Sequence, residues 1–295
     1  TDELGNARFY DNETDNYQQD HYQLHWNERV SENWSTNFAV HYTKGKGYYE
    51  NFNDEADLAA FNLVSAGTES ISDVIDQKWL DNDFYGTTFS LKRKGAVAEW
   101  LVGGGWNTYL GDHFGKVIWT RVASSSELGD HYYDNLATKK DGNIFVKGQF
   151  QLSQNWSAYG DLQFRRVNYE ADGILATGIS DTFAFLNPKA GLTYAWNKEN
   201  QLYFSYAKAQ REPNRTDYEN GNPRPEKLDD FELGWRKKSA KGSWAINGYY
   251  MGYQDQLVLT GELDEVGNPI RVNSGKSYRL GVEVDASWAI SPKFE

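Results

Sequence analysis

Residues 278–290 read YRLGVEVDASWAI and form the clearest repeating pattern in the chain. Apolar residues occupy every even position of this stretch, whereas Arg279, Glu283 and Asp285 occupy odd positions. Successive side chains of a β-strand point to opposite faces, so the stretch predicts a strand with one apolar and one polar face. The rest of the chain repeats this pattern.

Alternating runs occur in pairs along the chain, and each pair is joined by a short turn. The short turns lie at residues 31–33, 94–95, 153–155, 197–200 and 239–242. Stretches without a period of two separate the pairs and lie at residues 51–83, 109–141, 170–184 and 211–225. Short turns at one end and long loops at the other are typical of outer-membrane β-barrels. The predicted fold is therefore all-β, an antiparallel up-and-down transmembrane β-barrel with short periplasmic turns and long extracellular loops.

The number of strands predicts an incomplete barrel. We count about eleven strands, including one expected at residues 244–260, and the turn at Ser291–Pro292 indicates a twelfth. A closed bacterial barrel has an even number of strands and no free edge. Residues 1–295 are therefore expected to be one segment of a larger barrel. Its two unpaired edges would favour aggregation or pairing with a second copy.

The composition fits this fold class and excludes several others. The chain has 27 glycines, six prolines and 16% aromatic residues, which suits strands and turns. Its formal net charge of −12 disfavours binding to nucleic acid, and the absence of cysteine excludes disulfides and thiolate metal sites. The mean hydropathy is −0.76. This low value remains compatible with a barrel, because every second residue of a barrel strand faces the lumen.

Tryptophans gather next to the short turns. Such a row predicts an aromatic girdle at the interface between membrane and water. The alternative is a soluble carbohydrate-binding β-sandwich with tryptophans near the edge of its core, but a sandwich does not need uniformly short turns at one end. The tryptophans concerned are Trp26, Trp34, Trp156, Trp196, Trp244 and Trp288.

Several motifs resemble the barrel of TonB-dependent outer-membrane receptors. They are QKWLDNDFYG at 77–86, GGGWNTYLGDHFG at 103–115, REPNR at 211–215, PEKL at 225–228, FELG at 231–234, YQDQLVLTG at 253–261 and NSGKSYR at 273–279. The resemblance covers almost the whole chain. It implies a barrel of about 22 strands around a plug domain. It also implies TonB-driven import of scarce nutrients, with this chain as a middle-to-late barrel segment that lacks the plug and the terminal strand.

The loop at 211–225 holds the main candidates for ligand binding. Guanidinium groups of Arg211, Arg215 and Arg224 can clamp carboxylate or catecholate oxygens, and the ring of Tyr218 can supply apolar contact. Further candidates from the family-like motifs are Trp79, Tyr109 and His113. A structural role is favoured for the motif itself, in which Arg211 and Glu226 fasten the loop to the barrel rim. The residues assigned to this structural motif are Arg211, Pro213, Glu226, Glu232 and Gly234.

Metal binding and catalysis receive less support. His21 and His25 share one strand face, and the turn at 31–33 should place His41 opposite the region between them, so these residues are weak candidates for metal ligands. The acidic stretch 51–83 is expected to be a solvated loop with a short helix near 54–61. Residues 103–105 are glycines on a strand, which indicates close approach of another segment. No catalytic triad or carboxylate pair is recognisable, and we expect neither an enzyme nor a cofactor.

The leading functional hypothesis is uptake of a ferric siderophore or haem-type iron complex through the outer membrane of a Gram-negative bacterium. The expected partners are the TonB complex, reached through the missing plug, the ligand and membrane lipid, with a surface lipoprotein as a further candidate. Alternatives within the family are import of oligosaccharide, peptide or cobalamin. A passive porin-like channel, an outer-membrane lipase and the β-sandwich also remain open.

Overall fold

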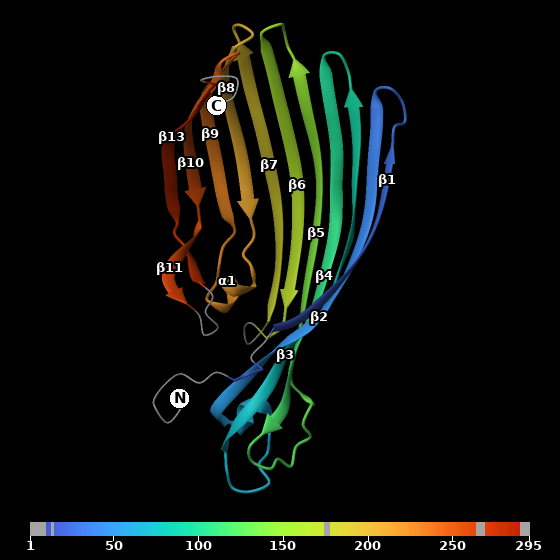
Figure 1. Ribbon diagram of the computed structural model, residues 1–295, viewed down its shortest axis with the longest axis vertical. Helices are drawn as coiled ribbons and strands as arrows, with labels where there is room; N and C mark the ends of the chain where they lie inside the picture. Colours follow the sequence, from blue (N-terminus) through green and yellow to red (C-terminus); the bar gives the residue numbers. More distant parts are fainter. Residues whose placement is uncertain (1–9, 13–14, 174–177, 264–268, 290–295) are drawn as a thin grey trace.

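The computed structural model describes residues 10–12, 15–173, 178–263 and 269–289. Eleven strands form one curved antiparallel sheet in which almost every strand pairs with its neighbour in sequence (Figure 1). The strands of this sheet are β1 Asp15–Glu28, β2 Trp34–Asp57, β3 Ile71–Lys94, β4 Ala98–Thr120, β5 His131–Gln151, β6 Trp156–Ala171, β7 Ile179–Ala195, β8 Asn200–Arg211, β9 Glu226–Ser239, β10 Gly242–Gln254 and β13 Lys276–Trp288. A separate hairpin pairs β11 Leu257–Leu263 with β12 Pro269–Asn273.

This architecture confirms the predicted fold class. The strands run up and down, with β1 and β13 at the two edges of the described sheet. The strands of the main sheet belong to one curved layer, so the two-sheet sandwich is wrong for the part of the chain that the structure describes. The predicted turn at Ser291–Pro292 lies outside the described residues. The described helices include none that is long and apolar enough to cross a membrane.

The apolar residues of the alternating pattern lie on the convex face and are exposed to the surroundings. Val282, for example, has 71% of its surface exposed, which would be unfavourable in water but is expected in contact with lipid. All six tryptophans next to the short turns are exposed as well. Other exposed apolar residues of this face include Leu24, Phe38, Phe89, Val102, Ile144, Phe164, Leu192, Phe204, Leu233 and Ile246.

Three of the four long loops were predicted too long. Strand β2 continues to Asp57 and β3 begins at Ile71; the loops at 109–141 and 170–184 are likewise mostly strand. Beyond the membrane the outer face carries ion pairs, such as Lys44 with Asp83 at 3.1 Å, so the period of two disappears while backbone pairing continues. The expected short helix is a 3-10 helix at Leu58–Phe61, and the fourth loop spans 212–225, one residue less than predicted.

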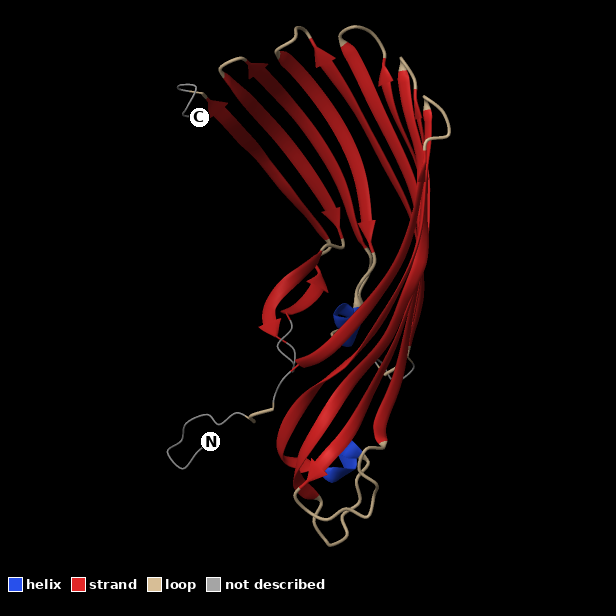
Figure 2. Ribbon diagram, turned by 45° about the vertical axis from the view of Figure 1, so that its right-hand side comes forward, coloured by secondary structure: helices blue, strands red, loops and turns tan. Residues whose placement is uncertain are grey.

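The strand expected at 244–260 is interrupted. Strand β10 ends at Gln254, and the chain turns at Asp255, which has a φ of 55°. On the neighbouring segment Gly275 has a φ of 75°, so both connections bend at the same level. The hairpin of β11 and β12 therefore leaves the direction of β10 and β13 and lies on the concave side (Figure 2).

The glycines at 103–105 lie in β4, where neighbouring backbone comes close. A Cβ atom added to Gly104 would lie 2.4 Å from the carbonyl oxygen of Asn143 on β5. We expect Gly104→Ala to lower the free energy of unfolding by about 1–2 kcal/mol, because backbone cannot move aside as a side chain can. Urea unfolding in detergent measures this change. Gly160→Ala is the matched control, since no atom lies within 4 Å of its added Cβ, and an equal loss in both variants would contradict the explanation.

The pairing of β7 with β8 ends at Lys189 and Ala207. The next residue of β7 is Pro188, which has no N–H to donate to a neighbouring strand. Beyond this point the side-chain amide of Gln210 reaches across and donates to the carbonyl oxygen of Leu186 at 3.0 Å. The segment after β8 then enters the concave side and forms the one-turn helix α1 Arg215–Glu219 (Figures 1 and 2).

Candidate functional site

A groove lies on the concave side, between the sheet and the inward-folded elements. One part, of about 790 Å³, is lined on the sheet side by Tyr49, Lys78, His113, Tyr133 and Asn135, and on the inner side by Arg215, Glu219, Asn220, Leu263 and Ile270. A second part, of about 500 Å³, shares Tyr49, Lys78, His113 and Tyr133 and extends to Tyr17 and Trp79. We call both parts together the inner groove. Strands β1 to β5, α1 and the β11–β12 hairpin contribute to it.

The inner groove combines two cations with neutral aromatic groups. It lies beyond the ion pairs of Lys44 and therefore outside the membrane-spanning part of the strands. Burial, followed by the charge of Arg215, lowers the pKa of His113, so the imidazole is neutral at neutral pH. Burial raises the pKa of Tyr133 to about 12, which keeps its phenol protonated. Lys78 and Arg215 are thus the positive charges of the groove, and Glu219 and Asp15 are its carboxylates, of which Glu219 pairs with the Nε of Arg215. The tyrosines supply apolar surface and hydroxyl groups.

Arg215 is only partly satisfied by protein. Its Nε donates to Glu219 at 2.7 Å, one helical turn further on. Its Nη1 is buried and has no hydrogen-bond partner among the residues that the structure describes. Because an unpaired guanidinium N–H away from water is unfavourable, this atom is suited to receive an anionic oxygen from a ligand.

Three features hold α1 in place. Asn214 and Asp217 form a capping box, in which each side chain accepts a hydrogen bond from the backbone N–H of the other. Tyr218 is buried against Tyr169 and other apolar residues, and its hydroxyl donates to Asp181 at 2.6 Å. Asp217 also lies 3.9 Å from the guanidinium of Arg271 on β12. Tyr218 therefore anchors the helix, and its buried ring does not line the inner groove.

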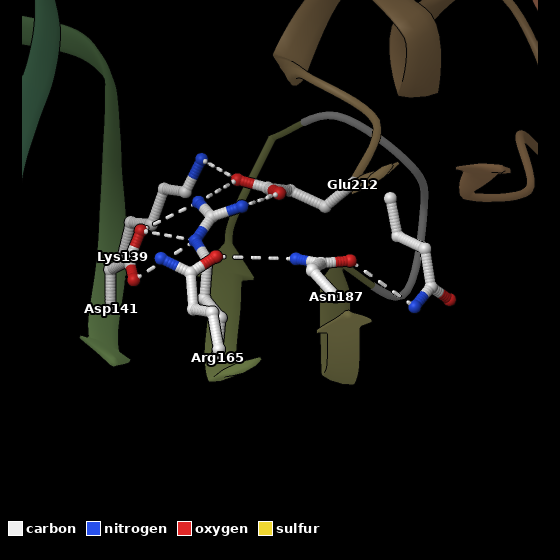
Figure 3. Close-up of polar contacts among 7 residues, drawn as sticks. Lys139, Asp141, Arg165, Asn187 and Glu212 are labelled. Carbon is white, nitrogen blue, oxygen red and sulfur yellow. Dashed lines mark hydrogen bonds and ion pairs between the residues drawn. The ribbon is translucent and has the colours of Figure 1, made fainter. Parts of the chain in front are cut away.

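A buried ion cluster fastens the start of this segment to the sheet (Figure 3). Arg165 of β6 donates to both carboxylate oxygens of Asp141 on β5, and its Nη1 and Nη2 donate to Glu212 at 2.7 and 2.8 Å. Lys139 Nζ lies 2.7 Å from the carboxylate of Glu212. Burial by itself raises the pKa of Glu212, but hydrogen bonds from Arg165 and Lys139 outweigh it and lower the pKa to about 2. Glu212 is therefore ionised at every physiological pH.

The other end of the segment is fastened at the bend of the hairpin. Arg224 donates to Asp255 at 2.7 Å, and its backbone N–H donates to the side chain of Asn273. Arg211 lies 3.6 Å from Glu226, which is the contact expected at the barrel rim, and Glu226 also accepts from the backbone N–H of Leu257. Arg224 and Arg211 thus contact other residues of the protein, and neither lines the inner groove.

The remaining predicted residues occupy different places. Trp79 is at the edge of the smaller part of the groove, but its ring lies on the outer face, between Tyr48 and Phe114 and near Lys46. Tyr109 lies over Gly111 on the same strand face as His113. Pro213 is buried beside Glu212. Glu232 is on the concave face of β9 opposite Ser205, and a Cβ atom at Gly234 would lie 2.3 Å from the ring of Tyr203, which explains the glycine.

The weak metal candidates are arranged in register but bind other groups. His41 pairs directly with Gln23, between His21 and His25, as the turn predicted. His21 contacts Thr43, His25 contacts Gln23 and His41 contacts Asn107. Within the described ranges, His, Asp and Glu form no group of three that could hold a metal ion.

Sequence analysis missed most of the important contacts. Lys78 lies within the quoted motif at 77–86, and Glu212 lies within the quoted REPNR motif. Lys139 and Asp141 lie at the end of the stretch 109–141, which was interpreted as a long loop, and Arg165 lies in an alternating strand. The only signal of Arg165 in the sequence was a charged residue on the polar face, a feature shared by many lumen positions.

Comparisons with known proteins agree with this fold. The chain matches the family model "TonB dependent receptor-like, beta-barrel" over residues 1–294. The ferric-catecholate import receptor Fiu from E. coli K12 is 14% identical to this chain with a TM-score of 0.60, and the match covers 97% of this chain and 47% of Fiu. The copper transporter OprC is 14% identical with a TM-score of 0.70, and the match covers 94% of this chain and 44% of OprC.

The siderophore receptor PiuA from Acinetobacter baumannii is also 14% identical, with a TM-score of 0.62, and the match covers 95% of this chain and 46% of PiuA. At such low sequence identity, these similarities show only that the folds are alike. The chain spans less than half the length of these solved structures. No curated protein sequence matches the chain.

Proposed function

The chain belongs to the β-barrel family of TonB-dependent receptors, and from this premise we propose that it forms the ligand-binding wall of an active importer in the outer membrane of a Gram-negative bacterium. The importer takes up a scarce nutrient, and energy reaches it from the TonB complex. The convex apolar face contacts lipid, the concave face lines the lumen, and the inner groove is the place where the ligand first binds.

The inner groove is the observation that carries this proposal. Two cations, Lys78 and Arg215, face the same space as several tyrosines, and the free Nη1 of Arg215 adds an unused donor. Such a surface fits a ligand that is both anionic and aromatic, because guanidinium and ammonium groups bind its oxygens and phenol rings pack on its apolar parts. A ferric siderophore with catecholate or carboxylate groups has this chemistry.

Two structural neighbours are described as a ferric-catecholate import receptor and a siderophore receptor, which supports an iron chelate as the ligand. The neighbour OprC is described as a copper transporter, which makes a copper species the second candidate. The proposed role of the chain, as the wall of an importer, is the same for either ligand.

Mass spectrometry of co-purifying molecules tests the proposal. The receptor is extracted in detergent from outer membranes of cells grown under iron starvation, and its bound small molecules are released and identified. We expect an anionic iron chelate. A copper complex, an oligosaccharide or a peptide would overturn the iron assignment, and a conductance trace typical of an open pore would overturn active import.

A further inference from the structure

The segment 212–225 lies inside the curve of the sheet, although it connects two strands at the long-loop end. Figure 2 places α1 within the concave side, next to the β11–β12 hairpin. A surface loop of this length would normally extend into water, where its backbone is solvated. Specific contacts must therefore hold the segment inward.

We propose that Glu212 is a positioning residue: its contacts with Arg165 and Lys139 fix the segment 212–225 against the sheet and thereby hold Arg215 over the inner groove. This inference rests on the proposed function only in so far as Arg215 is assigned a role in ligand binding. The placement of the segment itself depends on protein contacts and can be measured without any ligand.

The first argument is the extent to which Glu212 is engaged. Its side chain is only 6% exposed, and its two carboxylate oxygens receive Arg165 Nη1, Arg165 Nη2 and Lys139 Nζ. Planar guanidinium groups bind carboxylates in this two-bond geometry, which fixes direction as well as distance. Glu212 therefore orients the chain at the point where it leaves β8.

The second argument is the short path from Glu212 to Arg215. Pro213 restricts the backbone directly after Glu212, and the capping box of Asn214 sets the start of α1. A helix of five residues has no stability of its own in water, so its position depends on its anchors. Arg215 lies between two such anchors, Glu212 on one side and Tyr218 with Asp181 on the other.

The third argument concerns what a loss of Glu212 would leave behind. In Glu212→Gln, Arg165 keeps both bonds to Asp141, and Lys139, which is 36% exposed, can turn to water. The sheet should therefore stay folded while the segment loses the anchor that directly precedes Arg215. The variant thus separates positioning of Arg215 from stability of the barrel.

Distances between two spin labels test the placement directly. Because the chain has no cysteine, Lys140→Cys on β5 and Asn222→Cys on the segment give selective labelling sites. Both side chains are exposed. We expect one narrow distance distribution in the receptor with native Glu212 and a broad, shifted distribution in Glu212→Gln. Glu99→Gln breaks an ion pair with Lys92 at the short-turn end and is the matched control. An unchanged distribution in Glu212→Gln would overturn the proposal.

Affinity for iron(III) tris(catecholate) provides the second readout. We expect Glu212→Gln to weaken binding about 5- to 10-fold, and Glu212→Gln combined with Arg215→Met to bind no more weakly than Arg215→Met alone, because both act through one side chain. Fully additive losses would overturn the positioning role. If the unaltered receptor does not bind this complex, the failure lies with the proposed ligand, and the label distances alone decide on Glu212.

Discussion

Replacing Arg165 with methionine is expected to lower the free energy of unfolding of the receptor by about 3–5 kcal/mol, the usual cost of removing one partner from a buried ion pair. Arg165 alone bridges Asp141 and Glu212, whose side chains are 24% and 6% exposed. Without the guanidinium, two carboxylates share a poorly hydrated site, and Lys139 remains as the cation in contact with Glu212. Urea unfolding in detergent, followed by tryptophan fluorescence, measures the loss.

The loss of unfolding free energy in Arg165→Met should depend on pH. In the folded receptor the pKa of Glu212 is lowered from 4.5 to about 2, so its stabilising contribution is complete above pH 4.5 and disappears as the pH falls toward 2. The difference between the unaltered receptor and Arg165→Met should therefore be largest at pH 7 and smaller at pH 3. A difference that does not change over this range would argue against carboxylate burial as the cause.

Arg236→Met is the matched control for Arg165→Met. Arg236 lies on the concave face of β9 and stacks over the ring of Tyr203 at 4.3 Å, with its side chain exposed. Its removal leaves no carboxylate buried without a partner, so we expect a loss below about 1 kcal/mol. Equal losses in the two variants would show that any charge on this face matters as much as Arg165.

Substitution of the groove cations should cause the largest effect on ligand binding. We expect Arg215→Met and Lys78→Met each to weaken binding of iron(III) tris(catecholate) about 10- to 150-fold, the range for a lost hydrogen bond to a charged group. Titration of the detergent-solubilised receptor, with quenching of tryptophan fluorescence as signal, gives the dissociation constants. Binding should also weaken as salt increases, since the attraction is between opposite charges.

Lys208→Met provides the comparison for these two variants. Lys208 lies near the end of β8, where its Nζ is 3.9 Å from Asp229, and it does not line the inner groove. Lys208 shares the convex face of β8 with Phe204, so its substitution removes the same charge outside the groove, and affinity should change less than about twofold. A loss as large as that of Arg215→Met would indicate general attraction to a positive rim instead of binding in the groove.

The inner groove illustrates what residue types alone can and cannot predict. Arg215 and His113 were selected from their motifs, and both line the groove. Tyr218 was selected for the same reasons, yet it is 3% exposed and binds Asp181. Whether an aromatic ring faces a ligand or the protein depends on neighbours that are distant in sequence, and a single sequence carries no record of them.

Loop lengths were misjudged because the pattern of alternation depends on the surroundings of a strand as well as on its backbone. Within the membrane one face meets lipid, so apolar and polar residues alternate. Lys44, Lys46 and Asp81 lie beyond that level and pair with one another on the outer face. The backbone ladder of β2 and β3 continues there without the apolar signal from which strands are recognised.

Local patterning in the sequence was enough to predict the barrel class, the eleven strands of the main sheet and the end at which the short turns lie, but not the separate β11–β12 hairpin. Those properties follow from local rules, because a strand places alternate side chains on opposite faces and the membrane requires one face to be apolar. The inward course of the segment after β8 follows instead from tertiary contacts. That outcome depends on Glu212 meeting Arg165, 47 positions earlier in the chain, and such a contact exists only after the curved sheet has brought β5, β6 and the end of β8 together.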